Sequence, residues 1–170
     1  MPRTAPRREA VREHGRERGL DVRLLIAHGD AGWRDRLRRA AEDLSALGLV
    51  PVESSEGGSA VDLLLGEDAP GLAVVDWELP GVAGPEVCRQ VRARRSSGPP
   101  YIILIAPSRD QVSEAFAAGA DDCVPAGCGS HELQARLFAA RRLTASSTHM
   151  LGRTAAPVDE SSRSGTPHAL

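Results

Sequence analysis

Short apolar runs alternate along the chain with longer segments in which apolar side chains recur at helical spacing. Apolar runs without polar alternation are typical of strands that are buried on both faces of a parallel sheet. These runs predict strands at residues 22–27, 49–53, 71–76, 101–106 and 122–125. The helical spacing predicts helices at about residues 30–47, 57–65, 85–94, 110–118 and 130–143.

This alternation of strands and helices indicates an α/β fold with helices on both faces of a parallel sheet. Right-handed crossovers leave few topologies for such a chain. We expect the flavodoxin-like (βα)5 doubly wound sheet with strand order 2-1-3-4-5. In that order the ends of the first, third, fourth and fifth strands converge, at His28-Gly29, Asp76, Ile105-Ala106 and Pro125-Ala126.

The two ends of the chain differ in composition from its middle. Residues 1–20 contain six Arg and three Glu with almost no large apolar side chain, and residues 146–170 are rich in Ser, Thr and Pro. Such segments offer too little apolar surface to form a packed core. We therefore expect one domain at residues 21–145 between two disordered tails.

Charge and cysteine content narrow the class of protein. The 21 basic and 23 acidic residues leave a net charge of −2, which gives no reason to expect nucleic-acid binding. No apolar run has the length of a membrane span, and the three cysteines form no Cys-x-x-Cys pair. We predict a cytoplasmic protein whose cysteines, Cys88, Cys123 and Cys128, are ordinary small apolar side chains.

The segment from Leu72 to Gly81 carries the clearest candidate site. Its apolar run ends in the carboxylate of Asp76, and a turn follows at Pro80-Gly81. Open parallel sheets place their functional groups at the carboxyl ends of strands. A turn-capping role would explain Asp76 equally well. Asp30, after the first strand, suits the N-cap of the next helix.

Three motifs resemble those of one protein family, the receiver domain of bacterial two-component response regulators. The motifs are Val-Val-Asp-Trp-Glu-Leu-Pro-Gly-Val-Ala-Gly (74–84), Ala-Gly-Ala-Asp-Asp (118–122) and Asp-Ala-Gly-Trp-Arg (30–34). The first is similar to the phosphoacceptor segment of the family. Residues 101–104 and the pair Asp76-Trp77 look most like the receivers that precede diguanylate cyclase domains.

The resemblance implies a signalling domain that accepts a phosphoryl group on Asp76 from a histidine kinase. Family members hold Mg²⁺ near this position with an acidic pair and a backbone carbonyl, which here would be that of Glu78. They form homodimers and bind partners through a surface that here comprises residues 110–118, 122–125 and 130–143. The charged side chains expected on that surface are Glu132, Arg136 and Arg141.

Several family positions carry other residue types in this chain. The acidic pair falls on His28 and Gly29, the Ser or Thr on Ile105, the Lys on Ala126 and the aromatic switch residue on Cys123. Mg²⁺ needs several oxygen ligands, which one carboxylate and one carbonyl do not supply. A phosphoryl group on Asp76 would also lack a hydroxyl donor and a cation, and the chain contains no Lys at all. We therefore predict no bound Mg²⁺ and no other cofactor.

The leading hypothesis is a degenerate receiver that acts through protein contacts and is phosphorylated weakly or not at all. Its partners would be a histidine kinase, a downstream regulator or a second copy of the chain. Two alternatives stay open: a conventional phosphoryl-accepting response regulator, and a module that binds a small ligand in an apolar pocket around Ile105 and Ala126. The sequence contains no nucleophile–base pair, metal cluster or phosphate-binding Gly loop, so we do not expect an enzyme.

Overall fold

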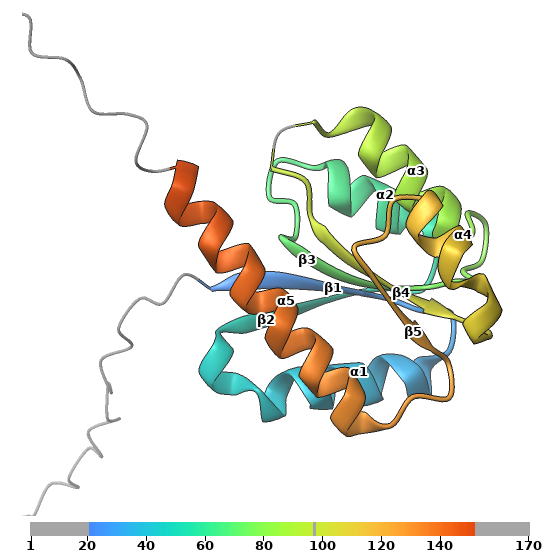
Figure 1. Ribbon diagram of the computed structural model, residues 1–170, viewed down its shortest axis with the longest axis horizontal. Coiled ribbons are helices and arrows are strands. Elements are labelled where there is room, and N and C mark those ends of the chain that lie inside the picture. Colours follow the sequence, from blue (N-terminus) through green and yellow to red (C-terminus); the bar gives the residue numbers. More distant parts are fainter. Residues whose placement is uncertain (1–20, 97, 152–170) are drawn as a thin grey trace, which may run out of the picture.

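The computed structural model describes residues 21–96 and 98–151, which form a layered α/β domain (Figure 1). Its strands are β1 (Val22–Ala27), β2 (Leu49–Ser54), β3 (Leu72–Asp76), β4 (Tyr101–Ala106) and β5 (Asp122–Pro125). They form one parallel sheet in the order β2-β1-β3-β4-β5. The predicted flavodoxin-like topology is therefore confirmed.

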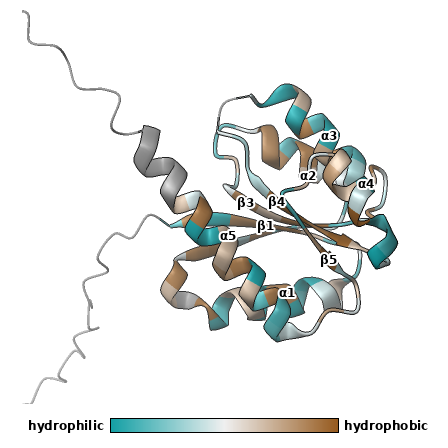
Figure 2. Cartoon of the chain, viewed as in Figure 1, coloured by the Kyte–Doolittle hydropathy of each residue, from teal (hydrophilic) through white to brown (hydrophobic). Residues whose placement is uncertain are grey.

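Helices cover both faces of this sheet (Figure 1). One layer consists of α1 (Ala31–Asp43) and α5 (Ser130–Leu151), and the other consists of α2 (Gly57–Leu65), α3 (Gly84–Arg94) and α4 (Val112–Ala117). Hydrophobic residues concentrate on the strands, as Figure 2 shows. Within the described ranges, no helix combines the length and apolarity that a membrane span requires.

Alternate residues of each strand face opposite helical layers. Leu72 and Val74 of β3 pack in the core under α1 and α5, whereas Ala73 and Val75 pack in the core under α2, α3 and α4. Asp76 continues the first series. Its side chain therefore emerges at the carboxyl end of the sheet, on the face that α1 and α5 cover.

The ends of three predicted helices differ in the structure. The first helix ends at Asp43, before the predicted residue 47, because a 3-10 turn at Ser45–Leu47 and Gly48 with φ +63° lead into β2. The fourth predicted helix begins with a 3-10 turn at Arg109–Gln111, whose capping box starts at Ser108.

The last helix, α5, runs beyond the predicted domain end at residue 145, as far as Leu151. Residues 146–151 contain neither Gly nor Pro, so no strong helix breaker occurs before Gly152. The Ser and Thr residues of this segment do not prevent helix formation. The remaining parts of the predicted tails, residues 1–20 and 152–170, lie outside the described residues.

Candidate functional site

The carboxyl ends of β1, β3, β4 and β5 form the candidate site. Asp76 and Ile105 are register partners on β3 and β4, and the Trp77 N–H donates to the Ile105 carbonyl at 3.0 Å. His28 follows β1, and its Nδ1 lies 3.7 Å from Asp76 Oδ2. Ala126 follows β5 and donates its N–H to the Ala106 carbonyl at 2.8 Å. The structure thus brings the family positions of these strands to one edge of the sheet.

Gly84 holds the loop after β3 close to the end of that strand. A Cβ on this glycine would lie 2.2 Å from the carbonyl oxygen of Asp76, and the Gly84 N–H donates to the Trp77 carbonyl at 2.9 Å. Only glycine permits so close a backbone approach. Glu78 is exposed on the turn between these residues, and a metal-binding role for its carbonyl stays a prediction.

His28 occupies a family acidic position, and its hydrogen bond and its burial both favour the neutral ring. The Asp30 N–H donates to His28 Nδ1 at 3.0 Å, so we assign the ring proton to Nε2. The residue is 8% exposed, and burial lowers the pKa of the imidazole more than the nearby Asp76 carboxylate raises it. At neutral pH, Asp76 therefore lies beside a neutral ring.

The His28 ring also stacks on α1, through residues that were not predicted as part of the site. Its centroid lies 5.3 Å from that of Trp33, with an angle of 11° between the ring planes. On the Trp33 ring lies the guanidinium of Arg36, with its carbon 4.5 Å from the centroid. Arg36 in turn donates a hydrogen bond to the carbonyl of Cys128, in the loop between β5 and α5. The i, i+3 spacing of Trp33 and Arg36 was the available signal, but only the fold brings His28 against Trp33.

Two further residues fix the loop between β1 and α1. The Asp30 side chain accepts from the Trp33 N–H at 2.9 Å, which confirms Asp30 as the N-cap of α1. Arg34 donates to the carbonyls of His28 and Gly29 at 2.8 and 3.0 Å. The Asp30 carboxylate thus caps α1, and Arg34 holds the backbone of the loop.

The remaining family positions provide no polar group toward Asp76. Ile105 is 1% exposed and packs in the core under α1 and α5, against which Ala126 also packs. Cys123 faces the opposite core, where it is half-buried. An isoleucine and an alanine can neither donate a hydrogen bond from a side chain nor carry a positive charge.

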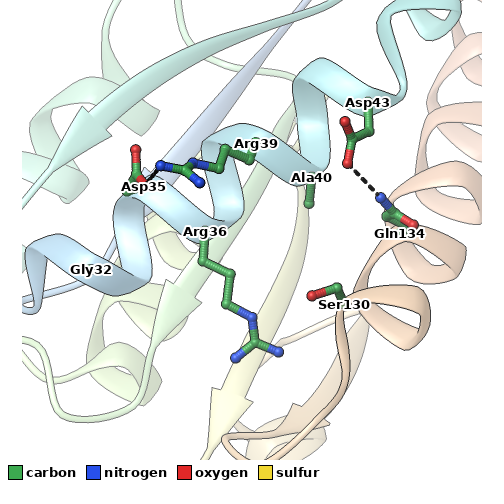
Figure 3. Close-up of a pocket in the computed structure, with 8 residues that line it drawn as sticks. All are labelled: Gly32, Asp35, Arg36, Arg39, Ala40, Asp43, Ser130 and Gln134. Carbon is green, nitrogen blue, oxygen red and sulfur yellow. Dashed lines mark hydrogen bonds and ion pairs between the residues drawn. The ribbon is translucent and has the colours of Figure 1, made fainter.

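Two surface pockets lie away from these residues. One, of about 300 Å³, lies between α1 and α5 (Figure 3) and is lined by Gly32, Asp35, Arg36, Arg39, Ala40, Asp43, Ser130 and Gln134. The other, of about 430 Å³, is lined by Asp21, Val22, Arg23, Asp68, Ala69 and Gly71. Neither pocket is lined by Ile105 or Ala126, so they give no support to the small-ligand alternative.

The three charged residues expected on the partner surface have contacts within the chain. Arg136 donates to both carboxylate oxygens of Asp122, at 3.1 and 3.2 Å, and lies 3.7 Å from Glu132. Arg141 donates to the Leu47 carbonyl at 2.8 Å, near the start of β2. Because β2 and β5 are opposite edges of the sheet, Arg136 and Arg141 extend from different sides of α5.

The cysteines have no sign of chemical activation. Cys88 and Cys128 are buried and Cys123 is half-buried, and all three are free thiols. Burial raises the pKa of Cys88 to about 12 and is also the main cause of the raised pKa values of Cys123 and Cys128. In residues 21–96 and 98–151, no three His, Cys, Asp or Glu side chains gather as a metal site.

Comparison with protein-family models matches residues 24–138 to the response regulator receiver domain. A curated relative, the response regulator MprA of Mycolicibacterium vanbaalenii, is 39% identical over 128 residues, which cover 74% of this chain and 52% of that protein. The chain therefore belongs to the receiver domain family of two-component response regulators. It spans about half the length of the curated relatives that it matches.

Solved receiver domains share the fold. The response regulator domain of CheB from Thermotoga maritima aligns with a TM-score of 0.61 and 21% identity, over 74% of this chain and 96% of that one. The receiver domain of the sensor histidine kinase PA1611 from Pseudomonas aeruginosa, which has a magnesium ion coordinated in its active site cleft, aligns with a TM-score of 0.60 and 19% identity, over 71% and 98%. Receiver domains are in general non-enzymatic modules that interact with histidine kinases and downstream effectors.

Proposed function

We propose that this receiver domain signals through protein contacts and does not depend on phosphorylation of Asp76. One observation carries the proposal: a neutral imidazole, with Nδ1 3.7 Å from Asp76 Oδ2, stands where the family has an acidic side chain. The His28 ring occupies the space beside Asp76 and adds no negative charge. Mg²⁺ prefers carboxylate and water oxygens in an octahedral shell, and this arrangement offers a single carboxylate.

The surroundings of Asp76 also lack the groups that stabilise a transferred phosphoryl group. Phosphoryl transfer depends on positioning and on neutralising charge around the transferred group. Ile105 is buried in apolar surroundings, and Ala126 ends in a methyl group. Two cations of α1 contact the residues around His28, but Arg34 donates to the carbonyls of His28 and Gly29, and Arg36 donates to that of Cys128.

Partners of such a domain would be proteins in the cytoplasm: a histidine kinase, a downstream regulator or a second copy of the chain. The proposed contact surface is the α4–β5–α5 face, defined here by Phe116, Cys123, Glu132, Arg136 and Leu143. Its Phe116 and Leu143 side chains are 48% and 54% exposed, although they are large and apolar. Large apolar side chains that stay exposed are typical of protein interfaces.

The test is Mg²⁺-dependent labelling of the full chain by a small phosphodonor, acetyl phosphate, followed by intact mass measurement. We expect no phosphoryl adduct in the wild-type chain, as in the matched control Asp76→Asn. A labelled wild-type chain with an unlabelled Asp76→Asn variant would overturn the proposal and identify a conventional response regulator. Mg²⁺ titration of Trp fluorescence should likewise show no saturable change; Trp77, which directly follows Asp76, and Trp33, which stacks on His28, are the two reporters.

A further inference from the structure

A continuous series of contacts connects Asp76 with the loop between β5 and α5. Asp76 contacts His28, His28 stacks on Trp33, Trp33 bears the guanidinium of Arg36, and Arg36 donates to the Cys128 carbonyl. We propose that His28, Trp33 and Arg36, named here the aromatic relay, couple Asp76 to this loop. The relay would supply a connection between the site and the surface that Ile105 and Cys123 cannot supply.

Each link of the relay transmits a displacement because its members are in direct contact. The nearly parallel rings of His28 and Trp33 cannot shift independently without losing their stacking. The Arg36 guanidinium is attracted to the Trp33 face and is also held by the Cys128 carbonyl. Cys128 is buried and donates its own N–H to the Pro125 carbonyl at 2.9 Å, so this loop is fixed to the end of β5.

The position of the His28 ring depends on the charge of Asp76. Its Nδ1 now accepts from the Asp30 N–H at 3.0 Å, while the Asp76 carboxylate lies 3.7 Å away. The charges that act on this ring are those of Asp76 on β3, Asp30 in the loop and Arg34 on α1. Because the Nδ1 lone pair and the Asp76 carboxylate repel each other, removing the charge of Asp76 changes the force on the ring and lets it shift against Trp33.

The far end of the relay lies at the surface. Arg36 lines the pocket between α1 and α5, in which it extends away from Asp35 and Arg39 (Figure 3). Coupling between two sites is reciprocal, so a protein that contacts Arg36 in this pocket would also change the surroundings of Asp76. The inference deepens the proposed function, since it gives a receiver without phosphorylation a route from its site to a partner.

The test compares backbone amide NMR spectra of the full ¹⁵N-labelled chain, without Mg²⁺ or phosphodonor. Asp76→Asn removes the charge and keeps the side-chain shape, and it should shift the amide signals of Gly127 and Gly129. In an Arg36→Gln background, the same substitution should shift these signals at least about two-fold less, because the last link is broken. The matched control is Arg39→Gln, since Arg39 lines the same pocket but pairs with Asp35 at 2.9 Å. It should leave the response unchanged.

Two further variants make the outcome decisive. Trp33→Leu should also reduce the response of the loop, and it replaces Arg36→Gln as the deciding variant if that chain does not fold. Arg36→Lys keeps a cation over the ring and should restore part of the response. The relay would be overturned if Asp76→Asn left the amide signals of Gly127 and Gly129 in place, or if it shifted them equally with and without Arg36. Phosphodonor labelling of Asp76 would contradict only the proposed function, so the two failures can be told apart.

Discussion

A single residue, His28, decides the electrostatics beside Asp76. A carboxylate at this position would add a second negative charge and attract a divalent cation, whereas the buried imidazole adds neither. The Asp30 N–H occupies its Nδ1 lone pair, and Trp33 covers one ring face. Histidine in place of an acidic residue therefore has two effects. It removes a possible metal ligand, and it attaches the first turn of α1 to the site through Asp30 and Trp33.

His28 should make the stability of the domain dependent on pH. Its folded-state pKa lies below the ordinary value of 6.5, so the unfolded chain binds a proton at higher pH than the folded chain does. The free energy of unfolding should be unaffected by this residue well above pH 6.5 and should fall as the pH is lowered through 6.5 toward the folded pKa. Urea denaturation on either side of pH 6.5 measures the effect.

The prediction is checked by replacing His28 itself. His28→Gln should flatten the pH dependence of the unfolding free energy, and Arg39→Gln, a change at an exposed side chain of α1 that does not titrate in this range, is the comparison variant. A wild-type chain that becomes more stable as the pH falls through this range would contradict the assigned neutral state of His28.

Gly84 should be intolerant of any side chain. Gly84→Ala places a Cβ 2.2 Å from the Asp76 carbonyl oxygen, and relief of this clash must move the end of β3 or the loop after it. We expect a loss of about 1 to 3 kcal/mol in the free energy of unfolding. Gly58→Ala is the control, because nothing lies within 4 Å of a Cβ there and the residue lies in α2. That change should stabilise the chain by up to about 1 kcal/mol.

At the scale of elements, Arg92 connects α3 with the segment before β4 and the segment before β5. It donates to the carbonyls of Gly119 and Pro100, both at 2.8 Å, and to the Asp121 carboxylate, which also accepts from the Ile102 N–H at 2.7 Å. Gly119 has φ +100°, and a Cβ there would lie 2.7 Å from the Arg92 side chain. This anchoring accounts for Gly119 and Asp121 in the Ala-Gly-Ala-Asp motif at 118–121.

Arg92→Ala should destabilise the domain by about 1.5 to 3 kcal/mol, since it removes hydrogen bonds to a carboxylate and leaves two partly buried carbonyls without this donor. Arg89, one turn earlier on α3, pairs only locally with Glu86 on the same helix in the contacts found for it. Arg89→Ala should change the free energy of unfolding little. Chemical denaturation of both variants measures the difference, and equal effects would refute the anchoring role of Arg92.

The α4–β5–α5 face should support self-association through apolar contacts more than through charge. Arg136 already pairs with Asp122 and Glu132, and Arg141 bonds to the Leu47 carbonyl on the other side of α5. We expect weak, concentration-dependent dimers in sedimentation experiments, reduced by Phe116→Ser and unchanged by Arg141→Gln. Dimers that respond to Arg141→Gln and not to Phe116→Ser would move the interface to another surface.

In the whole molecule, the order of the elements follows from local sequence patterns, whereas the contacts of His28, Trp33 and Arg36 arise only from the fold. Buried strands appear as unbroken apolar runs, so the order of elements and the edge of the sheet that carries Asp76 could be predicted. The relay could not, because stacking of His28 on Trp33 depends on how the first turn of α1 sits over the end of β1. The contact of Arg36 with Cys128 joins residues far apart in the chain, with no sequence pattern to indicate it.

The arrangement of the strand ends predicts that a conventional site can be rebuilt. The variant combines His28→Asp, Gly29→Asp, Ile105→Thr and Ala126→Lys, which restores the acidic pair, a hydroxyl donor and a cation around Asp76. We expect it to bind Mg²⁺ and to be labelled at Asp76 by acetyl phosphate, because the new carboxylates supply the charge that the cation needs and the new donors contact the phosphoryl group. Isothermal titration calorimetry and intact mass measurement detect the two gains.

The rebuilt site should lower the stability of the metal-free domain. A Cβ at Gly29 lies 3.2 Å from Pro80 Cδ, so this proline must shift by a few tenths of an ångström. The new carboxylates repel Asp76 without metal, Ile105→Thr buries a hydroxyl, and His28→Asp removes the stacking on Trp33. Added Mg²⁺ should recover part of this loss, since a ligand of the folded state stabilises it. The same variant with Asp76→Asn is the control and should not be labelled. A folded variant that neither binds Mg²⁺ nor accepts a phosphoryl group would mean that these four positions do not surround Asp76 closely enough to act together.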